Sequence, residues 1–270
     1  MPGPAVAWIG DAAAPELAWA RQQAGRHAEI RDLPLPLGSA PAGPADDDLW
    51  PALVLLASDG PARWSLADAV RVSRRWPLAP LVSVASTLVE GRRRSGPALP
   101  GIEEVPWCDL PSRLAGWLAD LAAGRRGTLG LPVTSRREDR VIEAATRLCR
   151  AAADGPGPSM SVAAARPADL EGLGDLLAAA GYTVARRSLG RPPLDEPADV
   201  LVWDVERCTD EQLSWLRMLT ANRPALAVVL VVSFPRREVV DAATAAGAAA
   251  VLGRPLAVES LAGALVAGPR

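Results

Sequence analysis

Two hydrophobic patterns alternate along the second half of the chain. Short apolar runs, typical of buried strands, are followed by longer stretches with apolar positions three or four residues apart, typical of amphipathic helices. We predict strands at 161–165, 182–186, 199–204, 225–233 and 248–252, and helices at 168–180, 209–221, 236–246 and 257–267. This alternation predicts a parallel sheet covered by helices on both faces.

The first half repeats the same rhythm less cleanly. Strands are predicted at 5–9, 28–31, 52–56, 81–85 and 103–107, and helices at 14–25, 65–76 and 111–123. A fourth helical stretch, 89–101, is interrupted by glycines, prolines and three consecutive arginines at 92–94. Residues 34–48 are rich in Pro, Gly and Ala and are typical of a solvated loop.

The chain therefore divides into three predicted parts. Residues 1–123 and 158–270 each form an α/β domain with a flavodoxin-like, doubly wound, five-stranded parallel sheet, and residues 124–157 join them. The linker contains an amphipathic helix that begins at a capping box made by Ser135 and Glu138. This helix either packs between the domains or carries a self-association seam.

Composition excludes several kinds of chemistry. All 29 basic residues are Arg, and the absence of Lys excludes Schiff-base catalysis and a P-loop lysine. The one histidine, His27, lies beside a predicted strand with no nucleophile motif near it. The net charge of −2 and the lack of a recognition motif argue against nucleic-acid binding. We expect no catalytic residues, no cofactor and no metal site, and hence no enzyme.

The cysteines and the apolar runs indicate a soluble cytoplasmic protein. Cys108, Cys149 and Cys208 are odd in number and far apart, which argues against a disulfide framework or a zinc site. The N-terminus lacks the basic region of a signal peptide, and the longest apolar run is too short to span a bilayer. We therefore expect no contact with a membrane.

Residues 159–267 resemble the receiver domain of bacterial response regulators, the CheY-like fold. The resemblance rests on Arg166-Pro167 before a leucine-rich helix, on "PADVLVWDVE", on Ser233 at a strand end, and on "AGAAAVLGRPL", which resembles the family's "AGADDYLVKPF". It implies a strand order of 2-1-3-4-5. It also implies that Asp204 stands at the phosphoacceptor position, and that Ser233 and Arg254 stand at the switch and phosphate-contact positions.

The segment differs from the family at the positions that bind the metal ion and contact the phosphoryl group. The family holds Mg²⁺ with an acidic pair, here Ala164-Ala165, and contacts the phosphoryl group with a lysine, here Arg254. A single remaining carboxylate is a poor magnesium site, and Asp169 has the position of an ordinary acid at a helix N-terminus. We expect Arg166 and Arg254 to pair with Asp204 instead and to lower its pKa.

The first half resembles the same fold only through its rhythm of strands and helices. Its phosphoacceptor position is Ala57, Gly10-Asp11 retains at most one acid of the pair, and Trp107-Cys108 ends the fifth strand without a Lys-Pro. The resemblance therefore implies a tandem of two degenerate receiver domains.

These observations predict a non-catalytic pseudo-receiver that acts through protein–protein contacts in bacterial signalling. Two alternatives stay open: a response regulator that is phosphorylated at Asp204, and a sensor that binds a small anion or nucleotide near Arg166 and Arg254. Trp50, Trp64 and Trp76 are candidate partner contacts. A homodimer is also expected, through an apolar face of the last two helices formed by Ala242, Ala243, Ala245, Ala246, Leu261 and Leu265.

Overall fold

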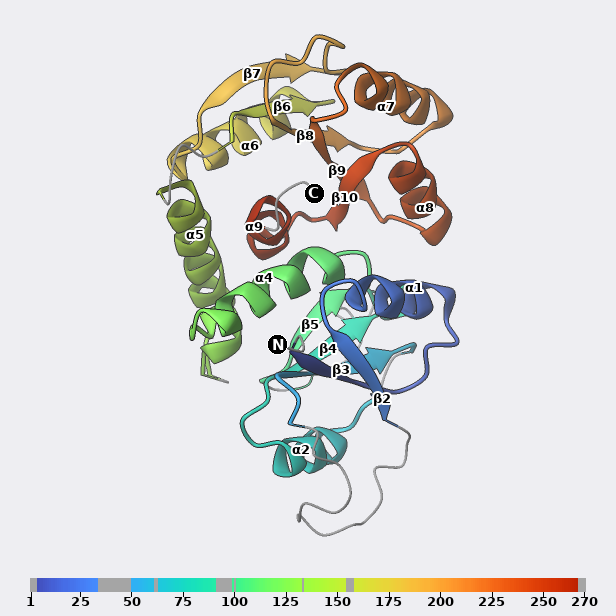
Figure 1. The fold of residues 1–270 in the computed structure, drawn as a ribbon, viewed down its shortest axis with the longest axis vertical. Coiled ribbons are helices and arrows are strands. Elements are labelled where there is room, and N and C mark those ends of the chain that lie inside the picture. Colours follow the sequence, from blue (N-terminus) through green and yellow to red (C-terminus); the bar gives the residue numbers. More distant parts are fainter. Residues whose placement is uncertain are drawn as a thin grey trace. The chain divides into compact units, whose positions relative to one another are not determined.

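The computed structural model divides the chain into two compact units, Met1–Arg136 and Arg137–Arg270 (Figure 1). The structure describes residues 4–33, 50–60, 63–90, 99, 101–132, 134–153 and 158–266. The predicted loop at 34–48, the arginines at 92–94 and most of the interrupted helical stretch therefore lie outside the described residues. The boundary between the units falls within the predicted linker.

The first unit contains one parallel sheet with the strand order β2-β1-β3-β4-β5. Its elements are β1 (Ala5–Ile9), α1 (Pro15–Ala24), β2 (Glu29–Leu33), β3 (Leu53–Ser58), α2 (Leu66–Arg75), β4 (Leu81–Ala85), α3 (Thr87–Glu90), β5 (Glu103–Pro106), α4 (Leu110–Ala122) and the 3₁₀ helix Gly127–Gly130. The central strand β3 is buried along its whole length, as expected for a strand covered on both faces.

Tryptophans pack against both faces of this sheet. On the side of α1 and α4, the rings of Trp19 and Trp107 meet edge to face, with centroids 5.2 Å apart. On the side of α2, Trp64 and Trp76 are buried against β1 and β3. Of the three tryptophans expected to contact a partner, only Trp50 is exposed.

The second unit repeats this topology, with the strand order β7-β6-β8-β9-β10 and all strands parallel. Its elements are α5 (Arg137–Ala153), β6 (Met160–Ala164), α6 (Pro167–Ala179), β7 (Val184–Leu189), β8 (Val200–Val205), α7 (Asp210–Asn222), β9 (Ala227–Ser233), α8 (Arg237–Ala245), β10 (Ala248–Arg254) and α9 (Val258–Val266). The predicted fold class and the strand order 2-1-3-4-5 are thus confirmed, and this order is that of flavodoxin and CheY.

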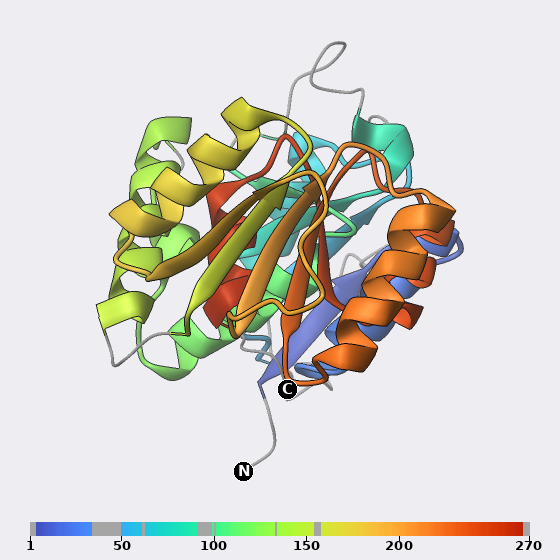
Figure 2. The same cartoon turned by 90° about the horizontal axis from the view of Figure 1, so that it is seen from above.

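The two faces of this sheet carry different helices. Figure 2 shows the strands side by side, with α6 on one side and α7 on the other. The core beneath α6 and α9 contains Val202, Val231 and Leu252, which alternate with residues that face α7 and α8. Because of this alternation, only strand-end side chains on the same face of the sheet can contact one another.

Helix α5 belongs to the second unit. It packs against α9, and Leu148 is fully buried in the same core as Leu261 and Leu265. The amphipathic pattern of the predicted linker helix therefore reflects burial within this unit. Ala144 is buried together with Leu148, whereas Ile142 on the same helix is 64% exposed.

The face expected to form a homodimer is mostly interior. Ala243, Ala246, Leu261 and Leu265 are buried, and only Ala242 and Ala245 of that set are accessible. The helical periodicity identified the apolar stripes of α8 and α9 correctly, but the sheet and α5 cover them. Within the described part of the chain, no helix is long and apolar enough to cross a membrane.

Candidate functional site

The candidate site of the second unit begins with Asp204, near the carboxyl end of the central strand β8. In an open α/β sheet, ligands bind at this edge. Asp204 is two residues after Val202 and therefore points to the side of the sheet covered by α6 and α9. Its side chain is only 5% exposed, so the carboxylate needs partners from the protein.

Arg254 supplies these partners, through two nitrogens of its guanidinium group. It ends β10, and its side chain passes over the end of β9 to reach β8. Its Nε donates to Asp204 Oδ1 at 3.0 Å, and its Nη2 donates to Asp204 Oδ2. The planar guanidinium thus contacts both carboxylate oxygens, a geometry that a lysine cannot reproduce.

Asp169 is a third member of the cluster. It lies in the first turn of α6, where an acid was expected only to stabilise the helix N-terminus. Nη2 of Arg254 also donates to Asp169 Oδ2, at 2.8 Å. Sequence reasoning missed this contact, although the position of α6 directly after β6, the neighbour of β8, was a usable signal.

Arg166 does not pair with Asp204, contrary to the expectation. Its Nη2 donates to Glu206 Oε1 at 2.6 Å, and both side chains are more than half exposed. Glu206 follows Asp204 by two residues and lies outside the buried site. Arg166 therefore acts on Asp204 only through its charge.

The pKa of Asp204 is raised, and not lowered as expected. Burial of the carboxylate has the largest effect, and it outweighs the lowering effect of the hydrogen bonds and charge of Arg254. The second carboxylate, Asp169, raises the pKa of Asp204 further. The pKa of the Arg254 guanidinium is raised, chiefly by its hydrogen bonds to Asp204, so Arg254 stays charged.

The positions of the family's acidic pair provide no carboxylate. Ala164 is buried and lies beside Asp204 in the β6–β8 register, and Ala165 is exposed. Ser233 ends β9, half buried, next to Arg254 in the register. Among the described residues, no group of three or more His, Cys, Asp or Glu side chains could hold a metal ion.

In the first unit, a tryptophan fills the corresponding position. The indole of Trp64 is buried, and its Nε1 donates to the carbonyl oxygen of Ala57 at 2.8 Å. Gly10 has a φ of +111°, and a Cβ at this residue would lie 3.1 Å from the Trp64 ring. Asp11 accepts from the backbone N–H of Ala13 and only closes a turn. This edge of the first sheet is therefore closed by Trp64.

No protein-family model and no curated protein matches the chain. Among solved structures, a putative pilus assembly-related protein from Burkholderia pseudomallei is 24% identical, with 42% of this chain and 92% of that chain covered and a TM-score of 0.37. The CheY-like protein TadZ from Pseudomonas aeruginosa is 25% identical over 39% of this chain and 94% of its own, with a TM-score of 0.32.

A third solved structure spans both units. The C-terminal part of Escherichia coli RcsC, which contains a linker region and a phosphoreceiver domain, is 15% identical, with 97% of this chain and 90% of that chain covered and a TM-score of 0.35. The fold of the two units is defined by their own strand order, and the chemistry must be argued from their own residues.

Proposed function

We propose that this protein is a non-catalytic pseudo-receiver that acts through protein–protein contacts in bacterial signalling. In this proposal, the Asp204–Arg254 pair replaces the phosphoryl group and the metal ion of a working receiver. The second unit is then held in one state by an ion pair that the chain itself supplies.

The observation that carries the proposal is the contact of Arg254 with both oxygens of Asp204. Attack on a phosphoryl donor requires an accessible carboxylate oxygen, together with a divalent cation that neutralises and aligns the phosphate. The guanidinium occupies the oxygens, and Ala164 and Ala165 offer no ligand to such a cation.

The charges at the site also disfavour an anion sensor. Arg254 is held by Asp169 and Asp204, and Arg166 is held by Glu206. Three carboxylates therefore surround two guanidinium groups, so an incoming phosphate or nucleotide would have to displace a carboxylate to bind. The sequence alone did not reveal this because Asp169 and Glu206 were not assigned to the site.

Chemical phosphorylation tests the proposal directly. The full-length protein is incubated with acetyl phosphate and Mg²⁺, and the intact mass is measured together with the mass of the peptide that contains β8. We expect no phosphoryl group on the wild-type protein. Stoichiometric phosphorylation that is lost in Asp204→Asn would overturn the proposal and favour a response regulator with an unusual site.

A matched variant shows whether the missing groups explain the result. Ala164→Asp, Ala165→Asp and Arg254→Lys together restore the acidic pair and the lysine of the family pattern. We expect this triple variant to gain Mg²⁺-dependent labelling at Asp204 if it retains the wild-type circular dichroism. Labelling of the wild-type protein at the same rate as the triple variant would contradict the role given to Arg254.

A further inference from the structure

A second candidate site lies in the first unit, on the opposite edge of its sheet from Trp64. A pocket of about 360 Å³ opens where β3 and β4 begin and where the segment after α4 passes. Its wall is formed by Trp50, Pro51, Ala52, Trp76, Leu78, Ala79, Pro80, Leu121 and Arg126. Because it is made from the amino ends of the strands, the pocket is separate from the receiver-like site at the carboxyl ends.

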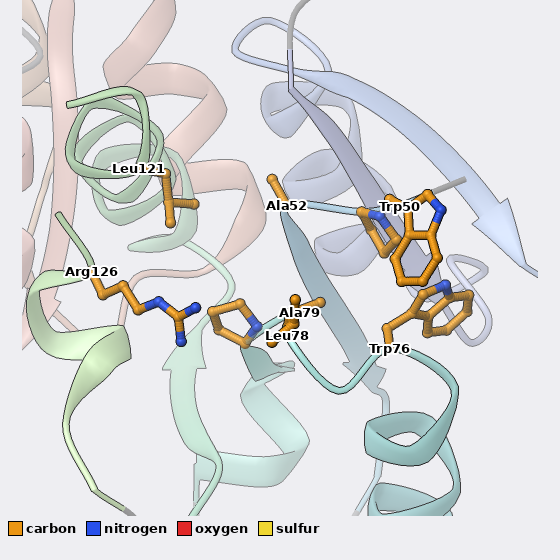
Figure 3. Close-up of a pocket in the computed structure, with 9 residues that line it drawn as sticks. Trp50, Ala52, Trp76, Leu78, Ala79, Leu121 and Arg126 are labelled. Carbon is orange, nitrogen blue, oxygen red and sulfur yellow. The ribbon is translucent and has the colours of Figure 1, made fainter. Parts of the chain in front are cut away.

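The two sides of the pocket differ in chemistry. Figure 3 shows the indoles of Trp50 and Trp76 together on one side and Arg126 on the other, with its guanidinium directed toward Leu78 and Ala79. The remaining side chains of the wall are apolar. A group that fills the pocket therefore meets aromatic surface on one side and a positive charge on the other.

Arg126 is the one charged residue of this wall. Within the described part of the chain, its guanidinium has no carboxylate partner, whereas the adjacent Arg125 is paired with Asp120 at 2.9 Å. The stem of Arg126 packs closely on Gly130, where a Cβ would lie only 2.6 Å from the Cβ of Arg126. A cation without a carboxylate partner, beside an apolar pocket, is suited to a ligand in which a carboxylate lies next to an apolar group.

The exposure of the rim indicates a peptide more than a small metabolite. Trp50 is 71% exposed and Leu78 is 72% exposed, so the apolar surface continues outside the pocket. Small-molecule sites enclose most of their ligand and have volumes of roughly 300–1,000 Å³. A pocket at the low end of that range with a wide apolar rim accommodates one large side chain while neighbouring residues lie on Trp50 and Leu78.

We propose that this pocket binds a segment of a partner protein in which a large apolar side chain is flanked by acidic residues. The apolar side chain enters between Trp76 and Leu78, and a neighbouring carboxylate pairs with Arg126. Pro51 and Pro80 have no backbone N–H to donate, so recognition relies on these side-chain contacts. The inference rests on the proposed role in protein binding and names the chemistry of the partner.

The test uses the full-length protein and short capped peptides. The first probe has a phenylalanine between two aspartates, the second has lysines in place of the aspartates, and the third has alanine in place of the phenylalanine. Binding is followed through the indole N–H signals of Trp50 and Trp76, assigned from Trp→Phe variants. We expect saturable binding of the first probe with a Kd of about 0.1–1 mM, and weaker binding of the other two.

Variants locate the interaction. Trp50→Ala should weaken binding of the first probe tenfold or more, since tryptophan is enriched among the residues that contribute most to binding energy. Arg126→Gln should weaken it about two- to fivefold, which is the range of an exposed ion pair, and should abolish the preference for aspartate over lysine. Arg26→Gln and Leu88→Ala, which change an exposed cation and an exposed apolar residue outside the pocket wall, serve as matched controls and should leave binding unchanged.

Two results would overturn the inference. One is the absence of saturable binding of the first probe up to about 5 mM, several times the expected Kd. The other is equal binding to the wild-type protein and to Arg126→Gln, because the partner would then not be selected by charge. Neither result involves Asp204. Failure of peptide binding can therefore be distinguished from failure of the proposed function, which would appear as phosphorylation of Asp204.

Discussion

Replacement of Arg254 by methionine tests the electrostatics of the site most directly. Methionine keeps much of the aliphatic volume but removes the guanidinium. Asp204 would then stay almost fully buried without either of its donors, and Asp169 would lose a contact that is one-third exposed. The large effect should therefore fall on Asp204 and not on Asp169.

The size of the effect can be bounded from two directions. Hydrogen bonds to a charged group contribute about 1.5–3 kcal/mol each, so the loss of two would cost about 3–6 kcal/mol if Asp204 stayed ionised. Asp204 can instead bind a proton, at a cost of about 1.4 kcal/mol for each unit by which the pH exceeds its pKa. Because protonation limits the loss, we expect Arg254→Met to lower the free energy of unfolding at pH 8 by an amount at the low end of the hydrogen-bond range, about 3 kcal/mol.

Asp204→Asn provides the matched comparison. It removes the buried charge, while Arg254 keeps its contact with Asp169 and some access to water. The raised pKa means that the folded protein holds the charged form of Asp204 less favourably than water does, chiefly because the carboxylate is buried. We therefore expect Asp204→Asn to change the free energy of unfolding by less than about 1 kcal/mol, well below the effect of Arg254→Met.

The pH dependence has a definite sign. A carboxyl group with a raised folded-state pKa stabilises the fold fully below its unfolded pKa, about 3.9, and this contribution is lost as the pH rises through the folded pKa. Arg254→Met removes two causes that lower the pKa of Asp204, so its folded pKa rises further. The deficit of Arg254→Met relative to wild type should consequently shrink between pH 8 and pH 5.

Hydrogen exchange measured by mass spectrometry on the β8 and β10 peptides suits this test, because it reports opening of the second unit even if the two units unfold separately. Equal losses for Arg254→Met and Asp204→Asn would refute the reasoning. A deficit that grows as the pH falls would refute it as well, since protonation should relieve the unpaired carboxylate.

Two further predictions concern packing. Gly10→Ala should destabilise the first unit by about 1–3 kcal/mol, because its positive φ is strained for alanine and the new methyl group would crowd Trp64. Faster hydrogen exchange in β1 would show this loss, and an unchanged exchange rate would contradict it. Leu148→Ala should destabilise the second unit by about 2–5 kcal/mol, because Leu148 is fully buried. Ile142→Ala, at an exposed position on the same helix, should change the free energy of unfolding by less than about 0.5 kcal/mol. Equal effects of the two variants in a denaturant titration would contradict the burial of Leu148.

Local patterns in the sequence were sufficient to predict the fold. The signals that mattered are local in sequence. One is the run of valines in β9, and another is the spacing of Thr209 and Gln212, whose predicted capping box is present at the start of α7. Parallel strands with helices on both faces then restrict the topology to a few possibilities. The strand order followed from the resemblance and agrees with these restrictions.

The site was harder to predict because its contacts compete. Arg166 has Glu206 within reach outside the sheet, and that exposed pairing avoids the desolvation of a second guanidinium beside Asp204. The direction of the pKa shift of Asp204 depends on how deeply the carboxylate is buried, which motif spacing does not reveal. Trp64 was assigned to a partner surface because nothing in the sequence shows that its ring turns back onto Ala57.

The packing of α5 on α9 has a consequence for how the protein is synthesised. These are the first and last helices of the second unit, so the core around Leu148 cannot be completed until α9 has left the ribosome. The first unit has no such requirement and can fold while the second is still being translated. Until α9 emerges, the apolar side of α5 is uncovered, and a nascent chain paused within β10 is the stage most exposed to aggregation.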